Sequence, residues 1–396
     1  MVRKASPSST RTHNSRLVLK TIYDGGPISR ADLSRATDLA APTVSDVVSD
    51  LMEQGLVEEM GYGPSTGGKP PILLSVVDDS RHLIGLDLAR RDFRGAVINL
   101  RGEIRHRVDL SLSNRSRDAA LALTYELVDA LVEGTDSPLL GIGIGAPGLV
   151  DVVNGVVQRA VNVDWRDVPL RDLLQGRYDL PVYVANDCQV AALAEYTFGN
   201  NEDVRDLVVV NVGYGVGAGI ILNGRLLHGN PSGAGEIGHV VVQPGGERCR
   251  CGNYGCLETI TSSRTIIQRA RAIAQSDPHS QLHQFSPSLE TITLGTICLA
   301  LQAGDTLVQR MIYEVGRSLG IAAANLVGVL GTCRILFAGS VTCFGQFLLD
   351  AVQEEMMKRA LSPLAENTEV GLVSLGSDIV LLGASALLLP NELGLF

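Results

Sequence analysis

Aromatic residues are scarce in this 396-residue chain, at 4%, and there is a single Trp. Gly is abundant instead, with 43 residues, which suits an α/β protein with many tight turns better than an aromatic-rich β-sandwich. Long apolar runs are lacking too, because the longest one, 380–389, is shorter than the ~20 residues of a membrane span. The N-terminus has no apolar segment with a small-residue cleavage site, so no secretory signal is predicted. We therefore expect a cytoplasmic protein without membrane insertion.

Basic residues are also few in comparison with acidic residues. The 43 acidic residues outnumber the 33 Lys and Arg, and the formal net charge is −10. A molecule of this charge is not a general binder of nucleic acid or anionic membranes. Residues 1–20 are the exception, since they carry no acid and five basic residues: Arg3, Lys4, Arg11, Arg16 and Lys20. Such an arm is either a solvated tail or a segment that contacts phosphates.

The arm leads into the pattern of three short helices. Apolar residues in 17–23 have helical spacing, and Ser29 is a suitable N-cap for a second helix. Pro42 suits the first turn of a third helix, whose apolar face comprises Val44, Val47, Val48 and Leu51. Two strands, 56–59 and 72–76, flank a Gly- and Pro-rich stretch. Together these features predict a winged helix-turn-helix DNA-binding domain over residues 1–80; a helical bundle for protein contact is the alternative.

The predicted third helix has acidic residues but no Lys or Arg. Base contacts would then fall to the hydroxyls of Thr43, Ser45 and Ser49. Phosphate contacts would fall to the arm and to Arg16, Arg30, Arg35 and Lys69.

The chain from about residue 80 reads as alternating strands and helices. Segments 82–88, 93–100 and 103–110 predict a three-stranded meander, and a second strand–turn–strand set begins at 207–211 and 217–222. Two successive α/β units that open alike suggest a duplicated architecture with a ligand cleft between the halves.

A cluster of metal-binding residues lies in the second half: His239, Cys249, Cys251 and Cys256. Three thiolates and one imidazole are typical of a closed, tetrahedral structural zinc site. Free thiols in a Gly-rich loop are the alternative, and a redox pair would not need the third Cys. We predict one structural Zn²⁺ without a hydrolytic role, and we expect the other four Cys to be buried apolar fillers.

Polar residues around this cluster could recognise hydroxyl groups. Asn186 and Asp187 sit at a strand-to-helix junction, where they either cap the helix or contact a ligand. Glu236 precedes His239 by three residues and Glu258 follows the last Cys by two, so zinc binding would draw both carboxylates together. His239 could bind zinc through one ring nitrogen and a sugar through the other. Asp187 could act as a general base or only accept a hydrogen bond.

Two segments, Gly-Glu-Ile-Gly-His at 235–239 and Cys-Arg-Cys-Gly-Asn-Tyr-Gly-Cys-Leu-Glu at 249–258, resemble the signature of the ROK family of repressors, open reading frames and sugar kinases. Segments 143–148 and 186–187 fit the same pattern, and residues 14–76 resemble the winged helix-turn-helix of its repressor branch.

This resemblance implies an actin-like, hexokinase-type α/β fold with two lobes, 81–190 and 191–377, the first completed by a C-terminal helix at 378–396. It also implies sugar contacts at Asn186, Asp187, Glu236, His239 and Glu258. Among these residues, Asp187 matches the catalytic base of the kinases.

Three departures from the family's kinases argue against efficient use of ATP. The kinases have Asp-x-Gly-Gly-Thr after the first strand, whereas residues 87–91 here read Asp-Leu-Ala-Arg-Arg. Tyr214 stands where the kinases have Thr in the Gly-rich segment 213–219, and 338–340 read Ala-Gly-Ser where a Gly-Gly pair is usual. Phosphoryl transfer needs close backbone contact with the nucleotide phosphates, so neither ATP nor Mg²⁺ is expected.

The sequence thus predicts a sugar-responsive transcriptional repressor that binds operator DNA as a homodimer or homotetramer. An ATP-dependent sugar kinase with an appended DNA-binding domain is the enzymatic alternative. A third reading is a sugar-insensitive scaffold for a partner such as a protein of a transport system.

Overall fold

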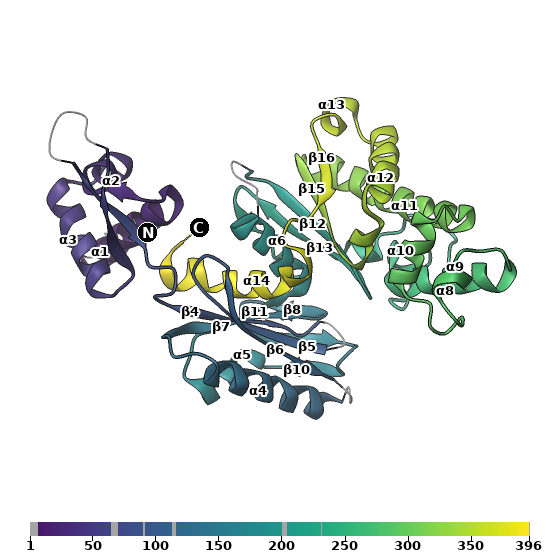
Figure 1. Cartoon of the computed structure of the whole chain (residues 1–396), viewed down its shortest axis with the longest axis horizontal. Coiled ribbons are helices and arrows are strands. Elements are labelled where there is room, and N and C mark those ends of the chain that lie inside the picture. The colour runs from purple at the N-terminus through teal and green to yellow at the C-terminus, as the bar shows by residue number, and fades with distance from the viewer. Residues whose placement is uncertain are drawn as a thin grey trace. The chain divides into compact units, whose positions relative to one another are not determined.

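The computed structural model describes residues 7–64, 70–89, 92–112, 116–199, 204–230 and 232–395. The chain forms two compact units (Figure 1). The first comprises Met1–Gly148, Val152–Ala185 and Ala384–Phe396, and the second comprises Leu149–Asp151 and Asn186–Gly383.

The first unit begins with the helical trio and wing that the sequence predicts. The elements are α1 (Pro7–Gly25), β1 (Ile28–Ser29), α2 (Arg30–Thr37), α3 (Ala41–Glu53), β2 (Val57–Tyr62) and β3 (Ile72–Val76), and the strands pair in the order β1-β3-β2. Ser29 is the N-cap of α2, as predicted, and its side chain accepts a hydrogen bond from the backbone N–H of Asp32. The predicted apolar face of α3 is buried, which fixes the opposite face of that helix toward solvent.

A five-stranded sheet is the centre of the rest of the first unit, with the order β11-β7-β4-β5-β6. Its strands are β4 (His82–Asp87), β5 (Asp92–Ile98), β6 (Ile104–Ser111), β7 (Leu139–Ala146) and β11 (Val182–Asn186). The same part of the unit contains the helices α4 (Arg117–Glu133) and α5 (Leu170–Tyr178) and the antiparallel pair β9 (Val156–Ala160) and β10 (Trp165–Val168), which belongs to a separate small sheet. The antiparallel β4–β5–β6 meander is confirmed, and β7 pairs in parallel with β4. Leu127 and Leu131 of α4 pack against Gly95 on one face, and the backbone of Ala384 packs against Gly143 of β7.

The second unit is built on a sheet of order β14-β13-β12-β15-β16. Its strands are β12 (Leu207–Val212), β13 (Val216–Leu222), β14 (Arg225–Leu226), β15 (Arg334–Gly339) and β16 (Glu369–Leu372). Helix α6 (Asp187–Phe198) packs against Gly219 of β13. Val208, Val210 and Val212 of β12 contribute to the core on which α11 (Thr306–Leu330) and α12 (Gly345–Arg359) pack. Both faces of this sheet are therefore covered by helices, as the near-continuous apolar strands require.

The remaining elements are β8 (Leu149–Asp151), η1 (Ile237–His239), α7 (Glu258–Thr261), α8 (Ser263–Ser276), α9 (Leu282–Phe285), α10 (Leu294–Gln302), η2 (Ser340–Phe344), α13 (Ser362–Ala365), η3 (Gly376–Asp378), α14 (Ile379–Ala386) and η4 (Leu389–Leu393). The sequence analysis did not identify α8, although Ser262 caps it through its side chain. The expectation of four buried apolar Cys is wrong for Cys333 and Cys343, which are exposed.

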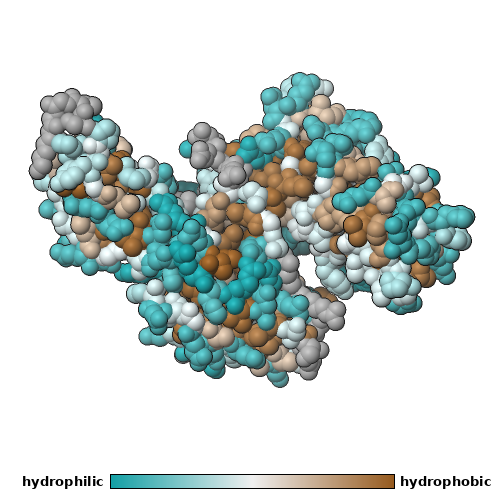
Figure 2. Space-filling model, viewed as in Figure 1, coloured by the Kyte–Doolittle hydropathy of each residue, from teal (hydrophilic) through white to brown (hydrophobic). Residues whose placement is uncertain are grey.

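Hydrophilic and apolar residues are interspersed on the visible face of the molecule (Figure 2). Among the described residues, none of the helices is both long enough and apolar enough to cross a membrane.

Candidate functional site

The four predicted metal ligands come together in the second unit. One ligand atom from each of His239, Cys249, Cys251 and Cys256 lies within 4.8 Å of the others. The Sγ atoms of Cys251 and Cys256 are 3.7 Å apart, and Cys249 Sγ is 3.6 Å from His239 Nδ1.

These separations can be compared with those around a zinc ion. A tetrahedral Zn²⁺ with Zn–S of about 2.3 Å and Zn–N of about 2.0 Å places two sulfurs roughly 3.8 Å apart, and a sulfur and a nitrogen roughly 3.5 Å apart. The donor set and its spacing therefore fit a tetrahedral metal ion of this size.

The metal loop is shaped by backbone pairing and one close contact. Val241 pairs with Cys256 and Arg248 pairs with Tyr254, so the loop folds back on itself. Gly255 has φ of +72°, and a Cβ there would lie 1.7 Å from the carbonyl oxygen of Gln243. Only glycine combines a positive φ with the absence of a Cβ, and the turn at Gly255 places Cys256 in the cluster.

His239 ends the short helix η1 and presents its two ring nitrogens to different partners. Nδ1 faces Cys249, whereas Nε2 is 3.9 Å from Oε2 of Glu236. The preceding Gly235 has φ of +96°, and its carbonyl accepts the N–H of Ala218 at 2.8 Å. A Cβ on Gly235 would lie 1.8 Å from the Ala218 oxygen, so glycine lets the 235–239 segment lie directly on β13.

Asn186 and Asp187 occupy the junction between β11 and α6. The Oδ1 atom of Asn186 accepts the N–H of Cys188 at 2.9 Å, so this residue is a helix cap, one of the two roles considered for it. Burial raises the pKa of the Cys188 thiol, and the nearby negative charges of Asp187 and Glu236 raise it further. Asp187 and Glu236 thus flank the same buried thiol, although they are far apart in sequence.

Glu258 begins α7, and its side chain is only 14% exposed. Its Oε2 accepts the N–H of Val216 at 3.2 Å, which holds the carboxylate beside the turn between β12 and β13. Its Oε1 is 3.8 Å from Nη2 of Arg250, a residue of the metal loop.

Arg250 is a residue that the sequence analysis missed. Its guanidinium lies over the ring of Tyr214, 5.0 Å from the ring centroid, which is within the range of about 6 Å for cation–π contacts. Its Nη1 donates to the Tyr214 hydroxyl at 3.4 Å. Arg250 therefore links the Gly-rich turn to Glu258, and nothing in the local sequence signals this, because the link depends on how the metal loop folds.

The first departure from the kinase pattern falls partly outside the described residues, which omit Arg90 and Arg91. Asp87 is buried, and its Oδ1 accepts the N–H of Ala89 at 3.2 Å. In the third departure, Ser340 donates its hydroxyl to the carbonyl of Val212 at 3.1 Å, so its side chain is bonded to the end of the neighbouring strand β12.

The predicted base-reading residues lie on α3. Ser45 and Ser49 are exposed and Thr43 is half-buried, since the opposite face of α3 packs into the domain. This helix presents the hydroxyls of Ser45 and Ser49 and the acid Asp46 to solvent, whereas Asp50 is half-buried.

The predicted phosphate contacts have partners within the first unit. Arg30 pairs with Glu59 at 3.0 Å, Arg35 pairs with Asp32, and Arg16 donates to the carbonyl of Asn391 at 3.3 Å. Arg11 pairs with Asp50 of α3 at 2.5 Å and neutralises one of its acids. Of the other predicted contacts, Lys69 and the arm residues Arg3 and Lys4 lie outside the described residues.

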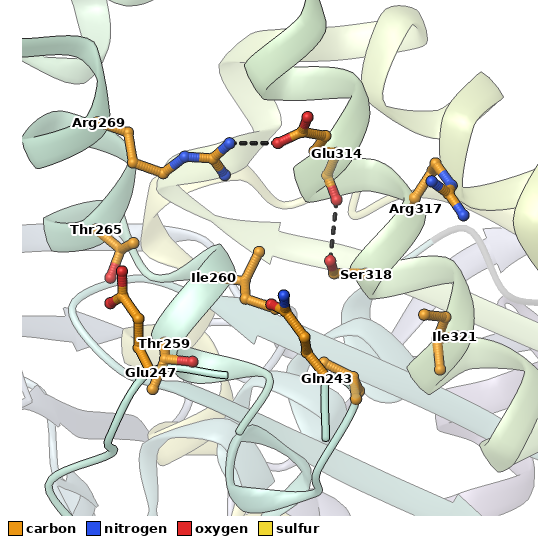
Figure 3. Close-up of a pocket in the computed structure, with 11 residues that line it drawn as sticks. Gln243, Glu247, Thr259, Ile260, Thr265, Arg269, Glu314, Arg317, Ser318 and Ile321 are labelled. Atoms are coloured by element: carbon orange, nitrogen blue, oxygen red, sulfur yellow. Dashed lines mark hydrogen bonds and ion pairs between the residues drawn. The ribbon is translucent and has the colours of Figure 1, made fainter. Parts of the chain in front are cut away.

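A pocket of about 400 Å³ adjoins the metal loop and α7 (Figure 3). Its lining includes Gln243, Glu247, Thr259, Ile260, Arg269 and Glu314. Arg269 and Glu314 point toward one another across the pocket and form an ion pair (Figure 3). The pocket contains none of the predicted site residues, and the charges of Arg269 and Glu314 are paired with each other.

Comparison with known proteins covers almost the whole chain. The ROK family matches residues 83–391, and winged helix-turn-helix DNA-binding matches residues 11–58. The xylose repressor of Caldicellulosiruptor bescii is 33% identical over 384 residues, 96% of either chain. A glucokinase of Halalkalibacterium halodurans is 33% identical over 319 residues, 79% of this chain and 96% of that enzyme.

A solved structure gives the same assignment. The crystal structure of a ROK family transcriptional regulator, a homologue of the E. coli MLC protein, aligns with a TM-score of 0.86 over 98% of both chains at 29% identity. The actin-like body and its N-terminal winged helix domain are thereby confirmed. The chain belongs to the ROK family and carries a winged helix-turn-helix DNA-binding domain.

Proposed function

We propose that this protein is a sugar-responsive transcriptional repressor. Its winged helix-turn-helix would bind operator DNA, and its ROK body would bind a sugar or a sugar derivative. One observation carries the proposal: a single chain joins a DNA-binding domain to a second unit that holds the full polar set Asn186, Asp187, Glu236, His239 and Glu258.

The polar set matches the chemistry of sugar hydroxyls. Carboxylates accept hydrogen bonds from hydroxyls, and such charge-assisted bonds are roughly twice as strong as neutral ones. Oε2 of Glu258 already accepts a hydrogen bond from the N–H of Val216. Its Oε1 would accept a hydrogen bond from a ligand hydroxyl, which would compete with Arg250 for that oxygen. Asp187 would accept a hydroxyl proton only if the protein were a kinase.

The Cys₃His cluster is proposed to hold one structural Zn²⁺. Four protein ligands fill a tetrahedral shell and leave no position for a substrate, so the ion would have no hydrolytic role. Its contribution would be to fix His239 beside Glu236 and Arg250 beside Glu258.

DNA binding would use Thr43, Ser45 and Ser49 for bases, with Arg16, Arg30, Arg35 and Lys69 on phosphates. A homodimer or homotetramer would read two half-sites about one helical turn, or a multiple, apart. As a regulator of transcription the protein would act in the cytoplasm.

The kinase alternative rests on the retained glycines of the 213–219 turn and on the likeness to the glucokinase. Against it stand the Arg-Arg sequence at 90–91 and the Tyr214–Arg250 contact on that turn. A coupled ADP-release assay across common hexoses decides between them. Turnover on the order of 1 s⁻¹ or faster would overturn the repressor proposal.

The direct test is a mobility-shift series on DNA from upstream of the gene, with and without candidate sugars. We expect salt-dependent binding that a sugar changes and that deletion of residues 1–80 abolishes. Unchanged binding after the deletion contradicts the proposal. If no sugar raises the melting temperature, the body would instead serve a protein partner, such as a component of a transport system.

A further inference from the structure

The end of helix α1 is buried against the turn between β5 and β6. Tyr23 is 7% exposed, and its hydroxyl donates to the carbonyl of Leu100 at 2.7 Å. Leu100 is itself buried. Burial raises the pKa of Tyr23 to about 12, so the hydroxyl keeps its proton and remains a donor. A helix of the DNA-binding domain is thus hydrogen-bonded to the body of the first unit.

Arg101 contacts both the backbone and the ring of the same tyrosine. Its Nη1 donates to the carbonyl of Tyr23 at 2.8 Å, and its guanidinium lies 4.1 Å from the centre of the ring. Its Nε pairs with Asp78 at 3.1 Å, in the segment that connects the wing to β4. One side chain therefore joins α1, the connecting segment and the β5–β6 turn.

The turn that carries Arg101 is itself held in place. Oδ1 of Asn99 accepts the N–H groups of Arg101 at 3.0 Å and Glu103 at 2.9 Å. The N–H of Leu100 donates to the carbonyl of Asp78 at 3.0 Å. Asn99 is fully buried, so the hydrogen bonds that its Oδ1 accepts are shielded from competing water.

A second anchor lies at the end of α3. Nη2 of Arg81 donates to the carbonyl of Gln54, the C-cap of α3, at 2.9 Å. The helix expected to enter the major groove is therefore tied to the last residue of the connecting segment, residues 77–81.

We infer that Tyr23 and Arg101 are positioning residues that fix the DNA-binding domain to the first lobe, so that the two move as one body. Residues 77–81 then act as a strut and not as a hinge. The inference holds whether or not the second unit binds a sugar, because all of these contacts lie in the first unit. Its functional consequence is that the spacing of two reading heads in an oligomer would be set by the lobes.

We call the contacts of Tyr23 and Arg101 between α1 and the β5–β6 turn the Tyr23–Arg101 joint. Hydrogen exchange of the full-length protein tests this joint without DNA or ligand. In Arg101→Ala we expect amides of α1 and α3 to exchange ~10-fold faster or more, whereas those of β4 and β7 stay within about twofold. Tyr23→Phe, which removes only the hydroxyl, should give a smaller change in the same helices. Arg101→Lys should recover part of the protection, since it keeps a cation for Asp78 but loses the planar stack.

Arg177→Ala is the matched control. Arg177 also stacks on a tyrosine, Tyr125, and pairs with an aspartate, Asp129, but these contacts lie wholly within the lobe. It should accelerate exchange in α4 and α5 and leave α1 to α3 unchanged. Equal exchange of α1 to α3 in wild type, Arg101→Ala and Tyr23→Phe would overturn the inference.

A second readout separates positioning from simple stability. Selection of DNA duplexes with randomised spacers between half-sites should give one spacing for the wild type and several for Arg101→Ala. A role in stability alone would weaken binding to every spacing alike and would contradict the positioning role. If the wild type binds no DNA, the proposed function fails, and the exchange result still decides whether the joint exists.

Discussion

Replacing one metal ligand is expected to cost the second unit much of its stability. Cys251 is exposed, so Cys251→Ser leaves no cavity and introduces no buried polar group. Its effect must then come from the metal site, because its Sγ lies 3.7 Å from that of Cys256 and completes the Cys₃His set. Serine is a poor ligand for zinc in comparison with a thiolate.

The magnitude follows from linkage between binding and folding. A metal present at 1,000 times its dissociation constant, and bound only by the folded state, adds about 4 kcal/mol. The second unit has roughly 200 residues, and for such a domain each kcal/mol shifts the melting temperature by about 2–4 °C. Loss of the metal should therefore lower the melting temperature by about 8–16 °C.

The assay combines elemental analysis of protein purified without added metal with thermal melts. Wild type should carry one zinc per chain, and Cys251→Ser should carry none and melt earlier. Cys333→Ser is the control, since Cys333 is equally exposed but lies outside the cluster. A Cys251→Ser protein that keeps a full equivalent of zinc, or that melts with the wild type, would refute the reasoning.

Three further changes test separate parts of the second unit. Glu258→Gln should weaken sugar binding in calorimetry by about 10- to 100-fold, the value of one charged hydrogen bond, whereas Glu247→Gln, in the pocket beside the metal loop, should not. Hydrogen bonding to Arg317 lowers the pKa of Glu355 in the folded protein. The ionised Glu355 carboxylate therefore stabilises the fold at pH values above its unfolded pKa, and this stabilisation is lost as the pH falls through the lower folded pKa. Glu355→Gln should therefore lower the melting temperature at pH 7, and melts below about pH 4 should show a smaller difference. Gly235→Ala should destabilise the fold by at least ~2 kcal/mol in urea unfolding, since its Cβ would lie 1.8 Å from the Ala218 oxygen; wild-type stability would contradict the close approach.

The elements of the chain were predictable wherever periodicity was strong. The helical trio and the meander follow from apolar spacing, and the buried face of α3 agrees with it. Helix α8 was missed although it is strongly amphipathic, because only Ile266, Ala270 and Ala274 are buried and two of these are alanines. Small buried residues such as alanine add little to the hydrophobic periodicity of a sequence, because their burial depends on how neighbouring elements pack.

The site was predictable to the extent that its residues belong to motifs. His239 and the three Cys share one short stretch, so their convergence follows from spacing. The pairing of Arg250 with Glu258 and Tyr214, and that of Arg11 with Asp50, depends on which surfaces meet after folding. A local sequence pattern does not indicate such contacts, because the two partners are 8 to 39 residues apart and lie on different elements.

The two proposed binding activities lie in different compact units, and this limits how one can influence the other. One of the points at which the chain passes from the first unit to the second lies between Ala185 and Asn186, directly before the proposed sugar contacts Asn186 and Asp187. A ligand held by Asn186 and Asp187 therefore acts on the first residues after that crossing. Coupling also requires that the ligand favour one arrangement of the units over another, typically by 1–3 kcal/mol. With the Tyr23–Arg101 joint intact, any movement of the first lobe would carry α3 with it, so the switch needs no separate hinge at the DNA-binding domain.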